Sequence, residues 1–277
     1  MAAPTGGSDG RCLGPPNLGK LGGRDGRRTA RPYAALLLFY SIVFPALRVY
    51  LIPRAADVVN LNIKENSIDP NALKPLPQEF YLQPTRQVAR ELIGGLLVHR
   101  VGGKVLVGRL VETEAYLAVG DPGCHAARGK TDRNAPMFGP PGTVYVYLIY
   151  GMHLCMNLVT QPEGTAEAVL LRAAEPLAGI GAMRERRGRH ALKDLCSGPA
   201  KLTEAFGVTL EHNRGDVTDG RLFVAPAPDP PAEVAVTTRI GLGEGCGEDL
   251  MLRYLVPDSP WLSRTPKPDA PVRIEER

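Results

Sequence analysis

The feature that most constrains the fold is an abrupt change of composition near Leu76. Residues 1–33 contain eight Gly and four Pro among scattered Arg. Such a segment buries too little apolar area to offset the entropy lost on ordering, so it predicts disorder. From about Leu76 the pattern becomes globular. We expect a largely disordered extension over residues 1–75, one folded domain over residues 76–264 and a flexible tail over residues 265–277.

An apolar run over residues 34–47 interrupts the extension. Its 14 residues would span only ~21 Å as a helix, whereas the hydrocarbon core of a bilayer is ~30 Å thick. Extending the run to residue 52 would place Arg48 inside the membrane, which is costly. We therefore expect no stable membrane association. A membrane tether over residues 34–52, a targeting segment and a start site placed too far upstream remain alternatives.

Charge is unevenly distributed along the chain. The net charge is +4, and residues 1–33 hold six Lys or Arg against two Asp, which accounts for all of it. The remainder has 27 basic and 27 acidic residues. A polyanionic partner would therefore have to bind a local patch. The densest basic cluster outside the extension is residues 184–190 (RERRGRH).

No segment predicts a metal or cofactor site. The five cysteines are far apart and include no C-x-x-C pair, which argues against a zinc ribbon and for free thiols in a reducing compartment; they are Cys12, Cys124, Cys155, Cys196 and Cys246. The glycine-rich segment 241–247 lacks the spacing of a phosphate-binding loop and precedes a strand-like run. It predicts a plain turn.

The order of predicted elements favours an α+β fold. Amphipathic or capped segments predict helices over residues 85–92, 177–189 and 199–206, the last capped by Ser197. Alternating or β-rich runs predict strands over residues 96–101, 105–116, 143–160, 168–174, 221–224, 234–240 and 250–256. Helices and strands do not alternate regularly, so we expect one domain around a mixed or antiparallel sheet with peripheral helices. The turn-rich segment 121–142 is expected to be a functional loop.

Carboxylates and tyrosines gather around this loop. Strand alternation places Glu112, Glu114 and Tyr116 on one face, although a solvent-facing strand edge would explain that pattern alone. Tyr147 and Tyr150 belong to a second tyrosine cluster, at the end of the next strand-like run. A sheet core rarely concentrates phenols, whose hydroxyls need partners. Together these residues indicate a pocket that stacks against a flat ring.

Five segments resemble, in order, the alkyladenine (3-methyladenine) DNA glycosylase family. They lie between about residues 76 and 264 and read VETEAY, GCHAARGKTDRNAPMFGPPGTVYVYLIYGMHLCMN, AVLLRAAEP, LCSGPAKL and DSPWLS. The resemblance implies a monofunctional base-excision repair enzyme that needs no metal or cofactor. It would flip 3-methyladenine, 7-methylguanine, hypoxanthine or ethenoadenine out of duplex DNA and hydrolyse the N-glycosidic bond, leaving an abasic site.

The resemblance also implies partners and a location. The partner would be double-stranded DNA containing damaged purines, and the enzyme a monomer. It would lie in the cytoplasm with the nucleoid if bacterial, or in the nucleus if eukaryotic. A non-catalytic binder of distorted DNA is the alternative.

Carried over position by position, the resemblance implies a catalytic group of three residues. Glu114 matches the general base that deprotonates the attacking water. His125 and Arg172 match the partners that hold this water and the carboxylate.

The resemblance assigns four positions to the base and one to the duplex. Tyr116, His125 and Tyr147 match the walls that sandwich the flipped base. Asn157 matches the pocket floor that excludes guanine, and Tyr150 matches the side chain that wedges into the duplex.

A patch for phosphate contacts is expected at the start of the helix over residues 199–206. Backbone N–H groups at a helix start attract anions, and Ser197, Gly198 and Lys201 lie there. Arg186 and Arg187 would add charge from the basic cluster. An ordinary Ser-capped helix is the alternative.

Overall fold

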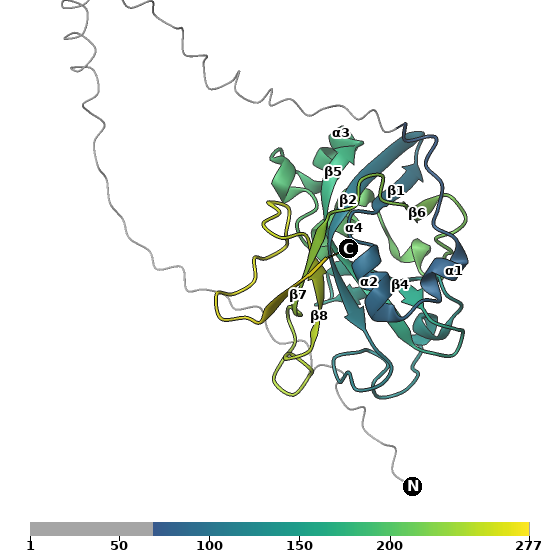
Figure 1. Cartoon of the computed structure of the whole chain (residues 1–277). Coiled ribbons are helices and arrows are strands. Elements are labelled where there is room, and N and C mark those ends of the chain that lie inside the picture. Colours follow the sequence, from purple (N-terminus) through teal and green to yellow (C-terminus); the bar gives the residue numbers. More distant parts are fainter. Residues whose placement is uncertain (1–68, 277) are drawn as a thin grey trace, which may run out of the picture. The chain divides into compact units, whose positions relative to one another are not determined.

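The computed structural model describes residues 69–276 (Figure 1). The expectations for the extension up to residue 68, including its apolar run, lie outside the described residues. Within residues 69–276, no helix is long and apolar enough to cross a bilayer.

A sheet of antiparallel strands dominates the described part of the chain. Its main path runs β3-β4-β5-β2-β8-β7-β9, and β1 pairs with both β2 and β6. The strands are β1 (Leu96–Val101), β2 (Lys104–Tyr116), β3 (Val144–Ile149), β4 (His153–Thr160), β5 (Glu167–Ala178), β6 (Leu222–Ala225), β7 (Glu233–Thr238), β8 (Met251–Leu255) and β9 (Val272–Glu276). The predicted α+β architecture is confirmed.

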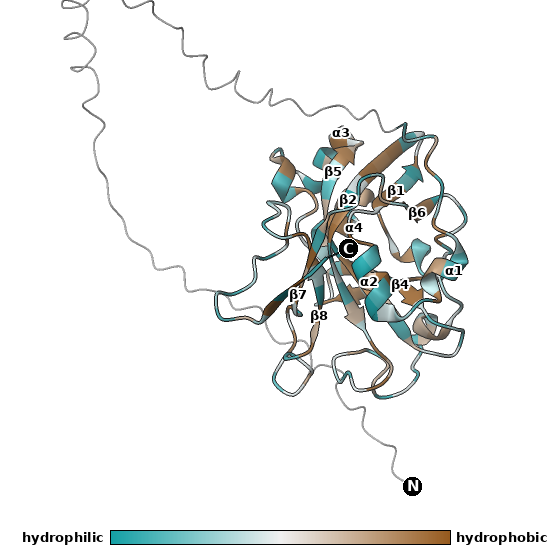
Figure 2. Ribbon diagram, viewed as in Figure 1, coloured by the Kyte–Doolittle hydropathy of each residue, from teal (hydrophilic) through white to brown (hydrophobic). Residues whose placement is uncertain are grey.

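Short helices surround this sheet. They are α1 (Gln78–Tyr81), α2 (Thr85–Glu91), α3 (Ile180–Arg187) and α4 (Pro199–Phe206), with 3-10 turns at Ala135–Phe138, Leu192–Asp194 and Leu210–His212. Apolar side chains of α2 and α4, such as Val88 and Phe206, are buried in the main hydrophobic core with the inward residues of the strands. Figure 2 shows the same division, with brown strands inside and the teal outer side of α2 facing solvent.

The long strand β2 organises the functional region. Its first half forms a hairpin with β1 through Gly102 and Gly103, whose φ angles of 58° and 70° suit glycine. Its second half pairs with β5 on one side and β8 on the other, so that Glu114 lies opposite Leu170 and Arg253. Side chains from these strands therefore meet around the end of β2.

Several element boundaries differ from the sequence predictions. The segment 143–160 divides into β3 and β4 at a turn where Tyr150 and Gly151 have φ angles of 53° and 70°. The helix predicted from residue 177 begins at Ile180 because β5 continues to Ala178 and Gly179 adopts a left-handed conformation. The tail expected over residues 265–277 contains β9, which pairs with β7 and satisfies its backbone groups.

The cysteine expectation is confirmed at three positions and wrong at one. Cys124, Cys155 and Cys196 are buried free thiols. Burial raises the pKa of the Cys155 thiol to about 11, which keeps it unreactive. Cys246 is disulfide-bonded, so the expectation of a free thiol is wrong there, since spacing in a sequence does not determine pairing.

A buried histidine pair makes stability depend on pH. His99 is 2% exposed, its Nδ1 lies 2.7 Å from the carbonyl oxygen of Phe206 and its Nε2 lies 3.3 Å from Nε2 of His212. Because the Phe206 carbonyl can only accept, Nδ1 carries the proton and Nε2 of neutral His99 is the acceptor for His212. Burial, with the nearby His212 and Arg186, lowers the pKa of His99 below its ordinary 6.5.

We expect the free energy of unfolding to fall as the pH drops below 6.5. Below that pH the unfolded chain binds a proton at position 99 that the folded chain does not, so protonation favours unfolding. Urea titrations at pH 7.5 and 5.5 measure the loss, which His99→Gln should reduce and His153→Gln, at an exposed position, should leave intact. An equal loss in wild type and His99→Gln would contradict the assignment.

Candidate active site

Glu114 lies at the centre of the site as a fully buried carboxylate with three donors. Its Oε1 accepts the backbone N–H of Ile240 at 2.8 Å. Its Oε2 accepts the hydroxyl of Tyr116 at 2.9 Å and Nη1 of Arg172 at 3.1 Å. The carboxylate is thus held in one orientation by groups that stabilise its negative charge.

A second buried carboxylate, Glu112, shares Arg172 with Glu114. Glu112 Oε1 accepts Nε of Arg172 at 2.9 Å and Nε of Arg253 at 2.8 Å. Ser263 donates its backbone N–H to Oε2 at 2.7 Å and its hydroxyl to Oε1 at 2.8 Å. Burial alone would raise the pKa of Glu112, but the two guanidinium groups and Ser263 together lower it below its usual range.

Arg172 uses all three guanidinium nitrogens within this network. Besides the two carboxylates, it donates from Nη2 to the Ser263 hydroxyl at 3.2 Å. Burial would lower the pKa of Arg172, and Glu114 and Glu112 instead raise it. The predicted proximity of Arg172 to Glu114 is therefore present in the fold, and the two buried carboxylates face two buried guanidinium groups.

A pocket lined by aromatic side chains begins at Tyr116. Its cavity volume is about 30 Å³, far below the roughly 300–1,000 Å³ of small-ligand sites, so its rings must move apart to admit a ligand. The residues that line it are Tyr116, Gly123, His125, Met137, Tyr145, Tyr147, Asn157 and Leu242. Four of the residues that the resemblance assigns to the base thus share one pocket. Tyr116 also contacts Glu114, so the pocket and the carboxylate share a side chain.

The rings in the pocket are closely packed. The Tyr145 and Tyr147 ring centroids are 5.1 Å apart, and the His125 ring meets Tyr147 edge-on at 4.5 Å. His125 Nδ1 lies 3.0 Å from the Tyr145 hydroxyl. Burial raises the pKa of Tyr116 and of Tyr147 well above the ordinary value, so both phenols stay protonated. Asn157 pairs with Tyr145 across β3 and β4 and also lines the pocket.

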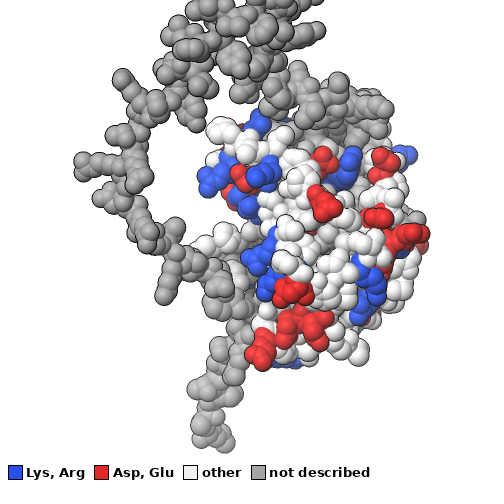
Figure 3. Space-filling model, turned by 60° about the vertical axis from the view of Figure 1, so that its left-hand side comes forward, with Lys and Arg blue, Asp and Glu red and all other residues white. Residues whose placement is uncertain are grey.

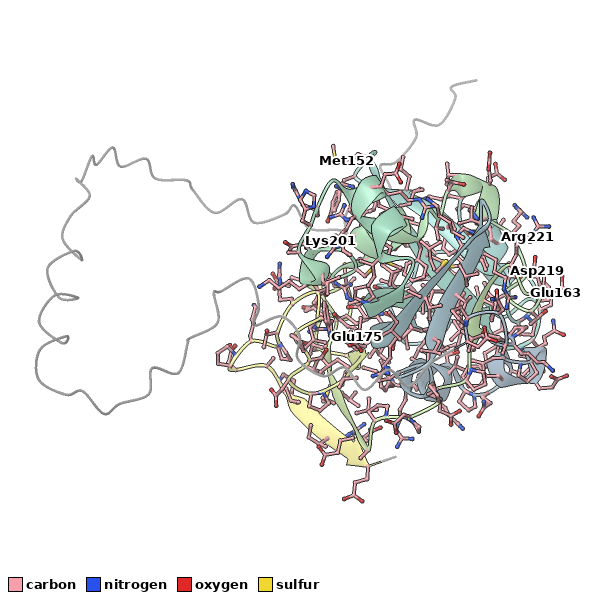
Figure 4. The ribbon with its side chains drawn as sticks, turned by 90° about the horizontal axis from the view of Figure 1, so that it is seen from above. Met152, Glu163, Glu175, Lys201, Asp219 and Arg221 are labelled. Atoms are coloured by element: carbon pink, nitrogen blue, oxygen red, sulfur yellow. The ribbon has the colours of Figure 1, made fainter. Side chains whose placement is uncertain are left out.

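Tyr150 lies outside the pocket, at the tip of the β3–β4 hairpin. It is 50% exposed, and its neighbours Leu148 and Met152 are 42% and 72% exposed. The hairpin therefore presents apolar side chains to solvent, and Figure 4 shows Met152 at the margin of the molecule. An exposed apolar tip beside a pocket is typical of an interaction surface.

The residues expected to contact phosphate fall into two groups, one at the start of α4 and one on α3. Ser197 forms a β-bridge with Ala173, next to Arg172, and so lies close to the site. It does not cap α4, because Gly198 occupies the N-cap position and no side chain caps the helix. The Ser197 hydroxyl instead lies 3.3 Å from Nζ of Lys201. The predicted Ser cap is therefore wrong.

Arg186 and Arg187 have partners within the protein. Arg186 donates to the carbonyl oxygen of Ala205 at 3.0 Å, and Arg187 forms an ion pair with Glu204. Both arginines thus join α3 to α4. On the face in Figure 3, Lys and Arg form separate groups with Asp and Glu between them, in keeping with the neutral balance after residue 33.

The glycine-rich segment 241–247 is a turn whose amides are already engaged. The Glu248 carboxylate accepts the backbone N–H groups of Gly245 and Cys246 at 3.0 and 3.1 Å. Within residues 69–276, no cluster of His, Cys, Asp and Glu has the geometry of a metal site.

The sequence analysis missed several residues of the site. Glu112 had a signal, because alternation places it on the face of Glu114, but it received no role. Arg253 and Ser263 have no local signal, since they reach Glu112 across 141 and 151 residues of chain. The same holds for Arg239, whose guanidinium lies 4.6 Å from the Tyr116 ring centroid.

Comparisons of the sequence with known proteins point to one family. A family model described as methylpurine-DNA glycosylase matches residues 79–260. A protein of Chlorobium phaeovibrioides, provisionally named 3-methyladenine DNA glycosylase, is 46% identical over 194 residues, covering 69% of this chain and 98% of that protein. Proteins with the same provisional name from Methanoculleus marisnigri and Chlorobaculum tepidum are 48% identical over 193 residues and 45% identical over 207. The match to the Methanoculleus protein covers 68% of this chain and the match to the Chlorobaculum protein 74%, and each match covers 98% of the relative's own length.

Proposed function

The chain belongs to the methylpurine-DNA glycosylase family, and on that premise we propose that it excises alkylated and deaminated purines from duplex DNA. The substrate class is that of 3-methyladenine, 7-methylguanine, hypoxanthine and ethenoadenine. The reaction hydrolyses the bond between the base and C1′ and leaves an abasic site. The partner is double-stranded DNA, bound by one copy of the chain where the chromosome lies, which is the cytoplasm in a bacterium and the nucleus in a eukaryote.

One observation carries the proposal: the tyrosine that lines the pocket also holds the buried carboxylate. Tyr116 donates to Glu114 at 2.9 Å and lines the pocket with His125 and Tyr147. A base between these rings would have its sugar at the pocket mouth. Glu114 is hydrogen-bonded to one of these rings, and a carboxylate near the sugar is the group that hydrolysis of a glycosidic bond requires.

The aromatic walls offset the cost of extruding a base. Flipping a nucleotide costs a few kcal/mol and costs least for a damaged or mispaired base. Stacking on an aromatic side chain is worth about 1–3 kcal/mol per base. N-alkylated purines carry a positive charge, so tyrosine faces add a cation–π attraction of about 0.5–2 kcal/mol. That charge also makes the base a better leaving group.

Glu114 acts as general base and as electrostatic stabiliser. Cleavage builds positive charge on the sugar, which the carboxylate stabilises while it takes a proton from the attacking water. Arg172 and the Ile240 amide fix its orientation. His125, in the pocket wall, helps to place the water. Tyrosine, arginine and a backbone amide are the groups bonded to Glu114, which supports direct hydrolysis without a lysine Schiff base, and hence a monofunctional enzyme.

Asn157 and His125 provide discrimination among bases. Asn157 lines the pocket beside Tyr145, where its side chain would clash with the exocyclic amine of guanine. A neutral lesion such as hypoxanthine has no cation–π advantage, so it needs a hydrogen bond to its ring. His125 supplies that donor from its side chain or backbone.

The surface near the pocket receives the duplex. Tyr150 enters the space that the flipped base leaves, and Ser197, Gly198 and Lys201 contact phosphates from the start of α4, whose backbone N–H groups attract anions. Arg186 and Arg187, which lie on α3, add positive charge to this surface.

Tyr150→Ala is expected to slow base release from a paired hypoxanthine about tenfold to a hundredfold, because a stacked ring worth about 1–3 kcal/mol is lost from the flipped state. Tyr150→Phe should retain most of the rate. Single-turnover kinetics on a duplex with hypoxanthine opposite thymine, and on one with the base in a bulge, measure the effect. It should shrink for the bulge, where flipping costs less. Equal rates in wild type and Tyr150→Ala on the paired substrate would contradict the wedge assignment.

The proposed function is tested by incubating the purified chain with labelled duplexes, each carrying one lesion of the class, and with an undamaged duplex. We expect mass spectrometry to detect the released base, and the DNA strand to be cleaved only after treatment with alkali. Cleavage without alkali would contradict the monofunctional assignment. Lesion binding without base release from any duplex would overturn the enzyme and favour the alternative, a non-catalytic binder of distorted DNA.

A further inference from the structure

A guanidinium group lies against each tyrosine wall of the pocket. Cζ of Arg239 is 4.6 Å from the Tyr116 ring centroid, and Cζ of Arg133 is 5.7 Å from that of Tyr147. The residues that line the pocket include both tyrosines and neither arginine. The two cations therefore contact the rings from outside the space that a base would occupy.

Arg239 is locked in this position. It forms a bidentate ion pair with Asp121 at 2.7 and 2.6 Å, and both side chains are completely buried. Its Nη1 also donates to the carbonyl oxygen of Ala115 at 3.2 Å, directly before Tyr116. Asp121 in turn accepts the backbone N–H of Gly123, a residue that lines the pocket. The guanidinium therefore stays against the ring when a ligand binds, with Asp121 balancing part of its charge.

Arg133 is held more loosely on the other wall. It is exposed, and its Nη2 donates to the carbonyl oxygen of Leu148 at 3.1 Å. Solvent therefore screens its charge more than that of Arg239. The two arginines belong to segments far apart in the sequence, yet each contacts the ring that the proposed function assigns to stacking.

A cation on one face of an aromatic ring reduces the net attraction of a second cation to the opposite face. The ring attracts a positive charge through its quadrupole. When a guanidinium already engages one face, a cationic base on the other face is attracted by the ring and repelled by the guanidinium. A neutral base stacks without this repulsion.

We propose that Arg239 and Arg133 set the selectivity of the pocket between positively charged and neutral purines, by holding cations against the outer faces of Tyr116 and Tyr147. This inference rests on the proposed function. It explains how a pocket built from electron-rich rings accepts neutral lesions as well as N-alkylated bases. Arg239 is a specificity residue that acts through Tyr116, because it does not itself line the pocket.

The test compares base release from two duplexes, one with cationic 7-methylguanine and one with neutral hypoxanthine, under single-turnover conditions. The ratio of the two rates cancels differences in the folded fraction. Arg133→Met removes the exposed cation. The double variant Asp121→Asn with Arg239→Met removes the buried pair without leaving an unpaired charge. Arg239→Lys keeps the positive charge as the matched control.

We expect the ratio of 7-methylguanine to hypoxanthine release to rise about twofold to fivefold in both neutral variants. In the double variant the loss of the Asp121 charge offsets part of the rise, and in Arg133→Met solvent screening does. Arg239→Lys should keep the wild-type ratio. If the double variant does not fold, Arg133→Met alone tests the inference. A higher ratio than in the wild type supports it, and an unchanged or lower ratio contradicts it. Suppose that the wild type releases both bases, but the ratio is unchanged or lower in the neutral variants. That result would overturn this inference and leave the proposed function standing. Wild-type release of neither base would overturn the proposed function, and this inference with it.

Discussion

Glu114→Gln is expected to slow base release from a lesion duplex about 10²–10⁴-fold, the range that a positioned general base contributes. The amide has nearly the shape of the carboxylate but cannot take a proton from water or stabilise positive charge on the sugar. One of its two polar atoms is an N–H group, which would face a donor, Ile240 N–H on one side or Tyr116 and Arg172 on the other. The pocket walls remain, so lesion binding should be retained.

Single-turnover rates and equilibrium binding to the same hypoxanthine duplex separate these two effects. Glu175→Gln is the matched control. It makes the same chemical change on β5, at a partly exposed residue paired with Arg109. We expect that control to release base at the wild-type rate. A Glu114→Gln protein that releases base as fast as Glu175→Gln would exclude Glu114 as the base.

Arg172→Met is expected to destabilise the fold by about 3–5 kcal/mol, because removing one partner of a buried ion pair leaves an uncompensated charge. Arg172 bonds to both Glu112 and Glu114, and each of these carboxylates is 0% exposed. Glu112 would keep Arg253 as a partner, whereas Glu114 would keep only neutral donors. Base release should also fall, because Glu114 loses its fixed orientation.

Urea unfolding of purified proteins at pH 7.5 measures this change. Arg109→Met removes an arginine whose side chain is 36% exposed and which pairs with Glu175 at 3.4 Å. That control should cost about 0–1 kcal/mol, as surface ion pairs usually do. Adding Glu114→Gln to Arg172→Met should restore part of the loss, because the buried carboxylate that keeps only neutral donors then carries no charge. A loss in Arg172→Met no larger than in Arg109→Met would contradict the buried network.

Local patterns in the sequence predicted the parts of the site that neighbouring residues build. Alternation along β2 placed Glu112, Glu114 and Tyr116 on one face, and the structure brings Glu112 and Glu114 together on Arg172. Of the second tyrosine cluster, Tyr147 lines the pocket as expected of a ring-binding site, and so does Tyr145, whereas Tyr150 lies outside it. These features depend on period-two geometry within one strand, which a sequence shows directly.

The parts that depend on distant pairing had no such signal. Arg239 and Asp121 are 118 residues apart in the chain, and each alone reads as an ordinary surface charge. β9 lies in a segment with charges and prolines, and only its pairing with β7 makes it a strand. The Ser197 cap failed for a similar reason. The bridge between Ser197 and Ala173 fixes the backbone before α4 and leaves Gly198 at the N-cap.

The most direct test of the central claim is a structure of the Glu114→Gln protein bound to a duplex that contains ethenoadenine. We expect the modified base between Tyr116 and Tyr147, Tyr150 in the space it leaves, and a water about 3–3.5 Å from both the side chain at position 114 and C1′. An ethenoadenine that remains stacked in the duplex, or a flipped sugar remote from position 114, would contradict it.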